Sequence, residues 1–366
     1  MNADTPALKI VIMAGGTGGH VFPALAVAEK LRARGVTLNW LGTARGLEAE
    51  LVPNADITLH CLPIEGVRGR GLAAKLRAPW LLLRAVLQAR KILQQIDPDA
   101  VLGFGGFASG PGGVAAWLLG KPLLIHEQNA VAGTTNRWLA RLASKTLAAF
   151  PGSLAGAVQV GNPVRESIAG VKPLALDQSR PLHLLVLGGS LGALALNQLL
   201  PEAIALLPHS QRPEVKHQCG RRHVEVTESG YNNRGVEAEV MAFIDDMAAV
   251  YEWADLVVCR AGALTIAELT LAGRGALLVP YPHAIDDHQT RNAQWLEDSG
   301  AALLRQQSDL SASMLAEFIE EVSADRPRLL AMAQQARSLG RADAAKTVAD
   351  YCEQTAREGL RKVAHG

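Results

Sequence analysis

The sequence has few features that would assign it to a special class of protein. It contains only four cysteines, which are far apart and form no Cys-x-x-Cys pair: Cys61, Cys219, Cys259 and Cys352. This favours reduced thiols in a cytosolic protein over a disulfide framework or a zinc site. No uncharged apolar run reaches about 18 residues, so we expect no membrane span. Residues 1–9 are polar and the apolar run Ile10–Ala14 is short, so we expect no signal peptide.

The chain also lacks an excess of charge of one sign. Its 36 Lys and Arg residues balance 35 Asp and Glu residues, and the net charge is +1. Bulk electrostatic attraction to nucleic acid therefore does not organise this protein, and we expect no nucleic-acid partner. With 49% hydrophobic residues over 366 positions, the chain has an ordinary globular composition and the length of two domains.

Glycine, in contrast, is plentiful and gathers in short loops. The apolar run Ile10–Ala14 has the length of a strand and leads into Gly15-Gly16-Thr17-Gly18-Gly19-His20. We expect the following helix to begin at Pro23, since proline suits a first helical position. A strand, a glycine loop and a helix N-terminus together form an anion-binding arrangement.

Three other interpretations of this loop are weaker. A dinucleotide fingerprint needs a glycine where Val21 stands, and an acid at the end of the second strand, where Leu41-Gly42-Thr43 has none. No Lys-Ser/Thr pair follows the loop, so it is not a P-loop. A tight turn without a ligand needs fewer glycines than this loop has.

Strands and helices alternate along the chain, which predicts an α/β fold with parallel sheets. In the first half we expect strands at Ile10–Ala14, 37–42, 57–63, 99–102 and 123–126, with a second glycine-rich turn at 103–111 and a helix through 114–119. In the second half we expect strands at 182–187, 214–218, 236–241, 256–259, 276–279 and 301–304, a helix at 193–207, and only helices in the tail from about 309 to 365.

The chain changes character at residues 161–182, where turn residues and prolines predict the connection between two domains. The opening pattern then restarts, with an apolar strand before Gly188-Gly189-Ser190-Leu191-Gly192. This second loop also matches the nucleophile elbow of serine hydrolases, and several downstream histidines keep that alternative open. The duplicated layout favours a phosphate loop and a ligand-binding cleft between two domains.

Two further segments carry polar chemistry. Small residues at 260–268 follow a strand and lead into a helix, where backbone N–H groups can hold a phosphate. Glu268, about one turn inside that helix, is suited either to bind vicinal hydroxyls or to stabilise the helix start. The segment His283–Gln289 is typical of a polar loop or a sugar-hydroxyl site more than of a metal site.

The stretch 66–95 carries seven Lys and Arg residues, no Asp or Glu, and many apolar residues between them. This pattern indicates either an interfacial surface for anionic lipid or an ordinary basic amphipathic helix packed on the sheet. The residues that we assign to a membrane contact are Arg77, Trp80, Leu81 and Arg84.

Taken in order, these motifs resemble a known family. Together with the loops above, the segments His126–Asn129, Gly161–Arg165 and Phe243–Met247 resemble those of the bacterial peptidoglycan glycosyltransferases of the GT-B fold. The resemblance implies two Rossmann-like domains facing across a cleft. It also implies transfer of N-acetylglucosamine from UDP-GlcNAc to lipid I, undecaprenyl-pyrophosphoryl-MurNAc-pentapeptide, which gives lipid II.

The resemblance implies a C-terminal domain, residues 166–342, that holds UDP-GlcNAc. Ser190 and the N–H groups near Ala263–Thr265 would face the diphosphate, Ile244 the uracil and Glu268 the ribose. Gln289 would bind the donor sugar, although Asp287 and His288 beside it depart from the glutamines that we expected there. The donor-binding residues implied by the resemblance are Thr17, Gly18, Gly19, Asn129, Arg165, Ser190, Ile244, Ala263, Leu264, Thr265, Ile266, Ala267, Glu268 and Gln289.

The N-terminal domain, residues 1–165 joined by a C-terminal helix at 343–366, would bind the acceptor and the membrane. The acceptor pyrophosphate would meet Gly15, Gly16, Gly105 and Gly106. The basic and apolar stretch would make the protein peripheral on the cytoplasmic face of the bacterial inner membrane.

The implied reaction is a single inverting displacement, in which backbone N–H groups stabilise the departing diphosphate and no metal or other cofactor is needed. His20 is our candidate for the base, because its loop faces the acceptor and its ordinary pKa is near neutral. A UDP-sugar epimerase of similar architecture, a dehydrogenase and a non-enzymatic lipid- or nucleotide-binding protein remain as alternatives.

Overall fold

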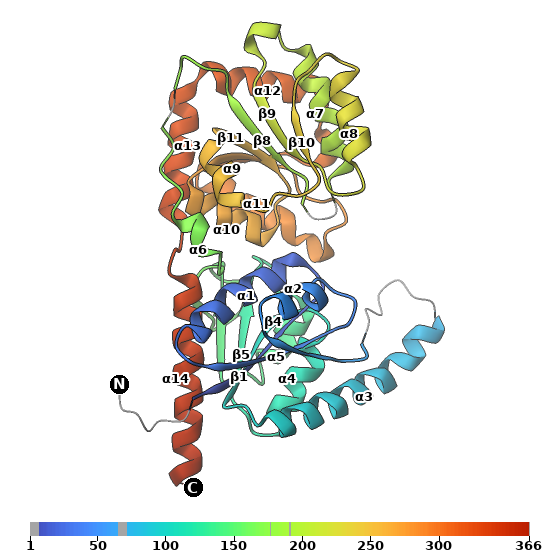
Figure 1. Ribbon diagram of the computed structural model, residues 1–366, viewed down its shortest axis with the longest axis vertical. Coiled ribbons are helices and arrows are strands. Elements are labelled where there is room, and N and C mark those ends of the chain that lie inside the picture. The colour runs from blue at the N-terminus through green and yellow to red at the C-terminus, as the bar shows by residue number, and fades with distance from the viewer. Residues whose placement is uncertain (1–6, 65–71, 176, 190–191, 366) are drawn as a thin grey trace. The chain divides into compact units, whose positions relative to one another are not determined.

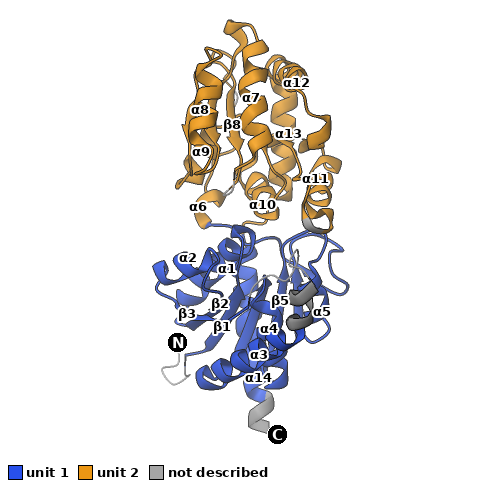
Figure 2. Cartoon of the chain, turned by 90° about the vertical axis from the view of Figure 1, so that its right-hand side faces the viewer, with its two compact units in different colours: residues 1–165, 343–366 blue, residues 166–342 orange. Residues whose placement is uncertain are grey.

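The computed structural model describes residues 7–64, 72–175, 177–189 and 192–365, and leaves the side chains of 72–78, 285 and 362–365 outside this description. The chain divides into two compact units, drawn in separate colours in Figure 2. Unit 1 comprises Met1–Arg165 and Asp343–Gly366, and unit 2 comprises Glu166–Ala342. Each contains one parallel sheet with helices packed on it, as Figure 1 shows.

The sheet of unit 1 has seven parallel strands in the order β3-β2-β1-β4-β5-β6-β7. Their bounds are β1 Lys9–Ala14, β2 Thr37–Gly42, β3 Thr58–Cys61, β4 Ala100–Gly105, β5 Leu123–Glu127, β6 Lys145–Ala148 and β7 Val158–Gln159. The chain runs from β1 to β3 in one direction across the sheet and from β4 to β7 in the other, so the strand order reverses beside β1. In open α/β sheets, ligands bind at the carboxyl ends of the strands at such a reversal.

The helices in the described part of this unit are α1 Gly18–Arg32, α2 Glu48–Asn54, α3 Leu72–Ile96, α4 Ser109–Leu118, α5 Thr134–Leu139 and α14 Ala344–His365. None of the described helices of the whole chain is long and apolar enough to span a bilayer.

Our expectation that the first helix begins at Pro23 was wrong. The carbonyl of Thr17 already accepts hydrogen bonds from the N–H groups of His20 and Val21, at 3.1 and 3.2 Å, so α1 begins at Gly18. Pro23 therefore lies inside the helix, where it deprives the Gly19 carbonyl of its ladder partner.

The expected strand at 99–102 also ended too early. Strand β4 continues to Gly105, because Gly103 pairs with both neighbours, Met13 of β1 and Ile125 of β5. A Cβ on Gly103 would lie 3.0 Å from a methyl group of Ile125. This glycine therefore permits close packing within the sheet and does not form a turn.

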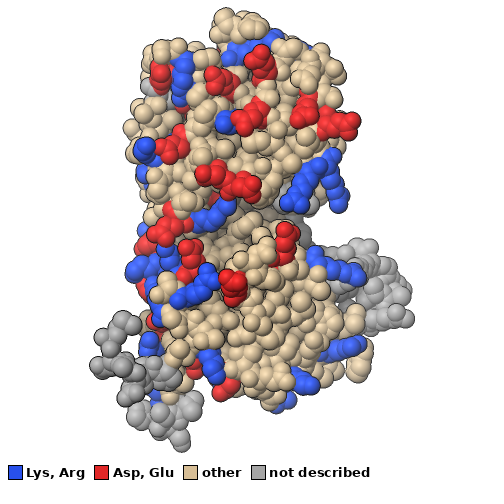
Figure 3. Space-filling model, in the orientation of Figure 1, with Lys and Arg blue, Asp and Glu red and all other residues tan. Residues whose placement is uncertain are grey.

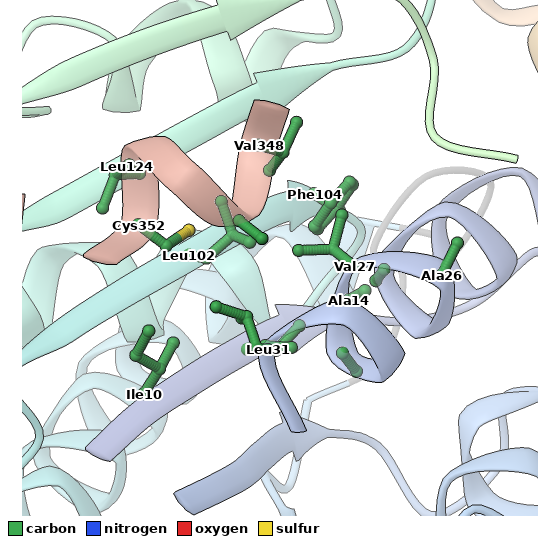
Figure 4. Packing of buried hydrophobic residues seen from close by; sticks show 14 of the residues in the cluster. Ile10, Ala14, Ala26, Val27, Leu31, Leu102, Phe104, Leu124, Val348 and Cys352 are labelled. Atoms are coloured by element: carbon green, nitrogen blue, oxygen red, sulfur yellow. The ribbon is translucent and has the colours of Figure 1, made fainter. Parts of the chain in front are cut away.

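Both faces of the unit 1 sheet are buried. Along β1, Ile10, Ile12 and Ala14 face one hydrophobic cluster, and Val11 and Met13 face another. The first cluster lies under α1 and α14, whose Leu31, Val348 and Cys352 are seen in Figure 4 among residues of β1, β4 and β5. The C-terminal helix thus completes the core of the unit formed by the N-terminal residues.

The sheet of unit 2 has six parallel strands in the order β10-β9-β8-β11-β12-β13. Their bounds are β8 His183–Leu187, β9 Glu214–Gln218, β10 Glu239–Met241, β11 Leu256–Cys259, β12 Gly275–Leu278 and β13 Ala302–Leu304. The expected strand at 236–241 is shorter than we anticipated. The other five lie where the sequence predicts them, within one residue at each end.

Unit 2 contains α6 Glu166–Ala169, α7 Leu194–Leu206, α8 Val224–Asn232, α9 Met247–Trp253, α10 Ala263–Ala272, α11 His288–Asp298, α12 Ala312–Ala324 and α13 Arg326–Leu339. Short 3-10 turns lie at His209–Gln211, Ile285–Asp287 and Gln307–Asp309. Pro327 stands in the first turn of α13, where its missing N–H costs no ladder bond.

A buried ion cluster joins the amino ends of β8 and β11 to α13 in this unit. The fully buried Asp255 accepts hydrogen bonds from both terminal nitrogens of Arg180, at 2.7 and 2.8 Å, and from the backbone N–H of His183 at 3.0 Å. Arg326 of α13 adds a contact at 3.3 Å. Although burial opposes ionisation of Asp255, these donors outweigh it and lower the pKa of the carboxyl.

The Asp255 cluster makes stability depend on acid pH. A carboxyl whose pKa is lower in the folded than in the unfolded protein stabilises the fold above about pH 4, and this contribution is lost as the pH falls through the lowered pKa. We predict that Asp255→Asn reduces the free energy of unfolding at pH 7 by about 3 kcal/mol, and that the variant loses less stability on acidification than the parent. Urea unfolding followed by circular dichroism from pH 2 to 8 measures both. The exposed Glu237 is the control, and Glu237→Gln should change neither quantity.

Candidate functional site

Unit 1 gathers its glycine loops at the carboxyl ends of β1 and β4. Gly106 (φ +84°) lies against the first loop, and a Cβ there would be 2.4 Å from the carbonyl oxygen of Gly15. Gly105 faces the ring of His20, whose Nε2 would lie 3.2 Å from a Cβ on that glycine. The candidate base and the two predicted acceptor loops are therefore in contact with one another.

The first loop presents several backbone donors. Among the described residues, the N–H groups of Thr17, Gly18 and Gly19 have no hydrogen-bond acceptor, as is normal at a helix N-terminus. The N–H of Gly16 differs, because it donates to a carboxylate of the protein itself. An anion at this loop would therefore be held by the donors that follow Gly16.

That carboxylate belongs to Glu48, a residue whose role the sequence did not suggest. It is completely buried at the start of α2. Its Oε2 accepts from Gly16 N–H at 2.9 Å, and its Oε1 accepts from the N–H and the hydroxyl of Thr43 at 3.0 and 2.7 Å. Glu48 thus ties the first loop to the end of β2, with no room left for a side chain on Gly15.

The second loop is fixed by Ser109, which is also fully buried. Its Oγ lies 2.7 Å from the carbonyl oxygen of Gly105 and 2.9 Å from that of Met13, and accepts from Gly105 N–H at 3.2 Å. One hydroxyl therefore joins the ends of β1 and β4 and holds the turn before α4.

The end of β5 is a dense polar cluster. Glu127 accepts hydrogen bonds from Asn129, Gly133 and Asn136, all between 2.9 and 3.2 Å. His126 is fully buried, lies 3.0 Å from the Gly161 carbonyl oxygen, and burial lowers its pKa to about 4. It is therefore neutral at pH 7, and this cluster positions Asn129, one of the predicted donor-binding residues.

The segment 161–165 follows this cluster in unit 1. The guanidinium of Arg165 lies 5.5 Å from the ring of Phe22 on α1, a cation–π arrangement that places it near the first loop. Asn162 is 5% exposed, and neither atom of its side-chain amide has a hydrogen-bond partner among the described residues.

Unit 2 repeats the arrangement at the end of β8. The Gln218 side chain accepts from Gly189 N–H at 2.9 Å and donates to the Gly189 and Ala242 carbonyls at 3.0 and 3.2 Å. Gly192 (φ +77°) packs on the Cys219 carbonyl, which lies 2.2 Å from where a Cβ would stand. Ser190, which we expected to face the diphosphate, lies outside the described residues.

The start of α10 is the clearest anion-binding feature of unit 2. Gly262 precedes the helix, and the N–H groups of Ala263, Leu264 and Thr265 have no acceptor in the described parts of the chain. Behind them, Glu268 is only 5% exposed, and Tyr251 donates its hydroxyl to Glu268 Oε2 at 3.2 Å. Glu268 is therefore buried and bound to a donor, which a carboxylate that only stabilises the start of a helix does not need. That stabilising role was one of the two interpretations left open by the sequence.

The other predicted donor contacts lie on neighbouring elements of the same unit. Ile244 is buried just before α9, which Asp246 caps by accepting from Ala249 N–H at 3.0 Å. Gln289 lies in the first turn of α11, and its Oε1 accepts from Tyr281 N–H at 2.9 Å. Ile266 is buried and Ala267 partly buried within α10, and the N–H of Ile266 already donates to the Gly262 carbonyl at 2.9 Å.

An apolar and basic surface lies on unit 1. On α3, Trp80 is 69% exposed, and Leu81 and Arg84 are also exposed, whereas the side chain of Arg77 lies outside the description. Phe107, Trp117 and Trp138, on or beside α4 and α5, are exposed as well. The sequence did not indicate this, because their spacing along the chain gives no signal of exposure. Figure 3 shows that elsewhere on one face charges of both signs are interspersed.

Within the described ranges, no group of three or more His, Cys, Asp and Glu side chains could hold a metal ion. His283 and His288 lie near Asp287 in sequence, but Asp287 instead accepts a hydrogen bond from Thr290 at 2.6 Å.

Comparison with known families decides the classification. The N-terminal domain model of glycosyltransferase family 28 matches residues 10–148, and the C-terminal domain model matches 183–348. The chain belongs to glycosyltransferase family 28. It is a glycosyltransferase with two Rossmann-like domains, as the motifs predicted, and these matches leave the epimerase and dehydrogenase alternatives without support.

Family 28 relatives match over nearly the whole chain. A protein of Cellvibrio japonicus named UDP-N-acetylglucosamine–N-acetylmuramyl-(pentapeptide) pyrophosphoryl-undecaprenol N-acetylglucosamine transferase is 57% identical over 359 residues, which are 95% of this chain and 99% of that protein. A protein of the same name from Azotobacter vinelandii is 56% identical, with 95% and 99% covered. The crystal structure of Acinetobacter baumannii MurG is similar with a TM-score of 0.82 and 42% identity, covering 95% of this chain and 99% of that one.

The Glu48 tie gives a testable prediction for this family 28 enzyme. Glu48→Ala leaves the two buried donors of Thr43 and the partly buried N–H of Gly16 without this acceptor, and we expect the free energy of unfolding to fall by about 3 kcal/mol. Glu50→Ala, two positions along the same helix at an exposed site, should change it by less than about 0.5 kcal/mol. Equal effects of the two substitutions in urea unfolding would contradict the role that we assign to Glu48.

Proposed function

We propose that this enzyme transfers N-acetylglucosamine from UDP-GlcNAc to the C4 hydroxyl of the MurNAc residue of lipid I and so forms lipid II. The observation that carries the proposal is the 57% identity, over 95% of the chain, to a transferase whose name states these two groups. The motifs that suggested the same reaction span both units of the chain.

Donor binding is assigned to unit 2. The N–H groups at the start of α10 face the diphosphate, Ser190 assists them, the backbone at Ile244 meets the uracil, and Glu268 accepts hydrogen bonds from the ribose hydroxyls. Gln289 binds the sugar. The unpartnered donors of α10 and the buried, oriented Glu268 support this assignment.

Unit 1 is assigned to the acceptor. The donors after Gly16 and the turn at Gly105 and Gly106 are suited to the acceptor pyrophosphate, and Glu48 and Ser109 keep them in place. The sequence resemblance also assigns donor contacts to Thr17, Gly18, Gly19, Asn129 and Arg165 of this unit.

The reaction is a single displacement with inversion. The C4 hydroxyl of the acceptor attacks the anomeric carbon, its proton passes to a base, and the bond to the diphosphate breaks so that UDP leaves with the electron pair. His20 is our candidate base, because it lies beside both loops of the acceptor assignment. The helix dipole and N–H groups of α10 act where negative charge develops on UDP.

The reaction is tested with purified protein, labelled UDP-GlcNAc and a lipid I analogue. We expect UDP release only when the acceptor is present, with the label transferred to the lipid product. Release of UDP without acceptor, together with a free sugar, would instead identify a hydrolase or an epimerase. Binding of the donor without any turnover would leave only a carrier role.

We also propose that the enzyme is a peripheral protein of the cytoplasmic face of the inner membrane, bound through α3 of unit 1. The exposed Trp80 and Leu81 would enter the interface, and the basic residues would face anionic lipid headgroups. Trp117 of α4 and Trp138 of α5 are further exposed aromatic side chains of the same unit.

The membrane assignment predicts a charge effect. Reversal of Arg77, Arg84 and Lys91 to Glu should weaken sedimentation with phosphatidylglycerol vesicles by roughly tenfold or more, since each basic residue contributes about 1 kcal/mol. Reversal of Arg221, Arg222 and Arg234 of unit 2 is a control matched in charge and should leave vesicle binding unchanged. If both sets weaken binding equally, the membrane contact lies elsewhere.

A further inference from the structure

Tyr251 is a buried residue of unit 2 to which neither the motifs nor the resemblance gave a role. It lies on α9 and is completely buried, so its hydroxyl needs a partner inside the protein. That hydroxyl donates to Glu268 Oε2 on α10 at 3.2 Å, and Glu268 itself is 5% exposed. The bond therefore lies in surroundings where water competes weakly.

The backbone that carries Tyr251 is itself held in place. Arg274 is buried and donates its Nε–H to the Tyr251 carbonyl at 2.7 Å, and its Nη1 to the Ala272 carbonyl at 2.7 Å. These two carbonyls lie in α9 and at the end of α10. Burial lowers the pKa of Arg274 to about 10, so it remains charged at neutral pH. One guanidinium thus fixes the two helices whose side chains form the Tyr251–Glu268 bond.

The same helix joins two proposed contacts with the nucleoside. Ile244, assigned to the uracil, lies three residues before the first residue of α9, and the Asp246 cap sets where α9 begins. Tyr251 follows in the next turn and reaches the carboxylate assigned to the ribose. The positions of base and sugar are therefore coupled through α9.

A carboxylate binds a vicinal diol more tightly when its plane is already fixed, because two hydroxyls must meet it in one geometry. We propose that Tyr251 is a positioning residue: it holds Oε2 of Glu268, and thereby orients the carboxylate toward the 2′ and 3′ hydroxyls of a nucleoside diphosphate. The proposal rests on the proposed function, in which Glu268 takes the ribose hydroxyls.

The test measures recognition of the ribose and not overall affinity. The dissociation constants of UDP and 2′-deoxy-UDP are determined by calorimetry with the full chain, and their ratio reports the contribution of the 2′ hydroxyl. We expect Tyr251→Phe to reduce the preference for UDP by roughly five- to tenfold. Glu268→Ala should abolish the preference, and Tyr251→Phe should have no further effect in that background.

The matched control is Tyr231→Phe. Tyr231 is a second buried tyrosine of unit 2, and its hydroxyl bonds to His217 Nδ1 at 2.9 Å, away from Glu268. It should lose a similar amount of thermal stability and keep the preference of the parent for UDP. A general loss of packing would instead reduce the preference in both tyrosine variants, and this result would overturn the proposal.

The remaining outcomes separate the proposal from its basis. If Glu268→Ala abolishes the preference and Tyr251→Phe preserves it, Tyr251 does not position the carboxylate although the ribose assignment stands. If Glu268→Ala preserves the preference, the ribose assignment fails and the role of Tyr251 fails with it. Should Tyr251→Phe not fold, p-aminophenylalanine at position 251 keeps both shape and donor. It should retain the preference, and its loss would overturn the proposal.

Discussion

Burial of both faces of each parallel sheet is the constraint on which the rest of the structure depends. Strands such as β1 place alternate residues in two hydrophobic clusters, so neither face of the sheet is exposed to solvent and able to carry polar site residues. The backbone donors and polar residues of the predicted sites therefore lie at the carboxyl ends of the strands, where loops lead into helix N-termini. In both units, these ends are where the glycine loops lie and where the predicted site residues gather.

Buried polar side chains give these loops a fixed conformation. Glu48 and Ser109 do so in unit 1, and Gln218 does so in unit 2, each by bonding directly to loop backbone. The first loop shows why this matters for chemistry. Because Gly16 donates to Glu48, the donors left for an anion are those that follow it. Preorganised donors stabilise developing charge without first having to rearrange.

Much of the fold could be predicted from the sequence, because hydrophobic periodicity and glycine punctuation are local signals. The strands 37–42, 214–218 and 256–259 have the predicted bounds. The errors arose where contacts with distant or neighbouring backbone, and not local preference, determine the structure around a glycine or a proline. Gly103 continues β4 since a close neighbour on β5 requires it, and Pro23 lies within α1 since the Thr17 carbonyl starts the helix earlier. A single sequence carries no record of either contact.

The sequence by itself determined the alternation of strands and helices, the repeated glycine loops and the ordered motifs that identify the family, because each depends on residues close together in the chain. Only the tertiary structure decided which distant residues meet. Glu48 reaches back 32 residues to Gly16, Tyr251 meets Glu268 across two helices, and α14 returns to the core of unit 1. Such pairs depend on how the strands are ordered and packed, and no local pattern encodes their distances.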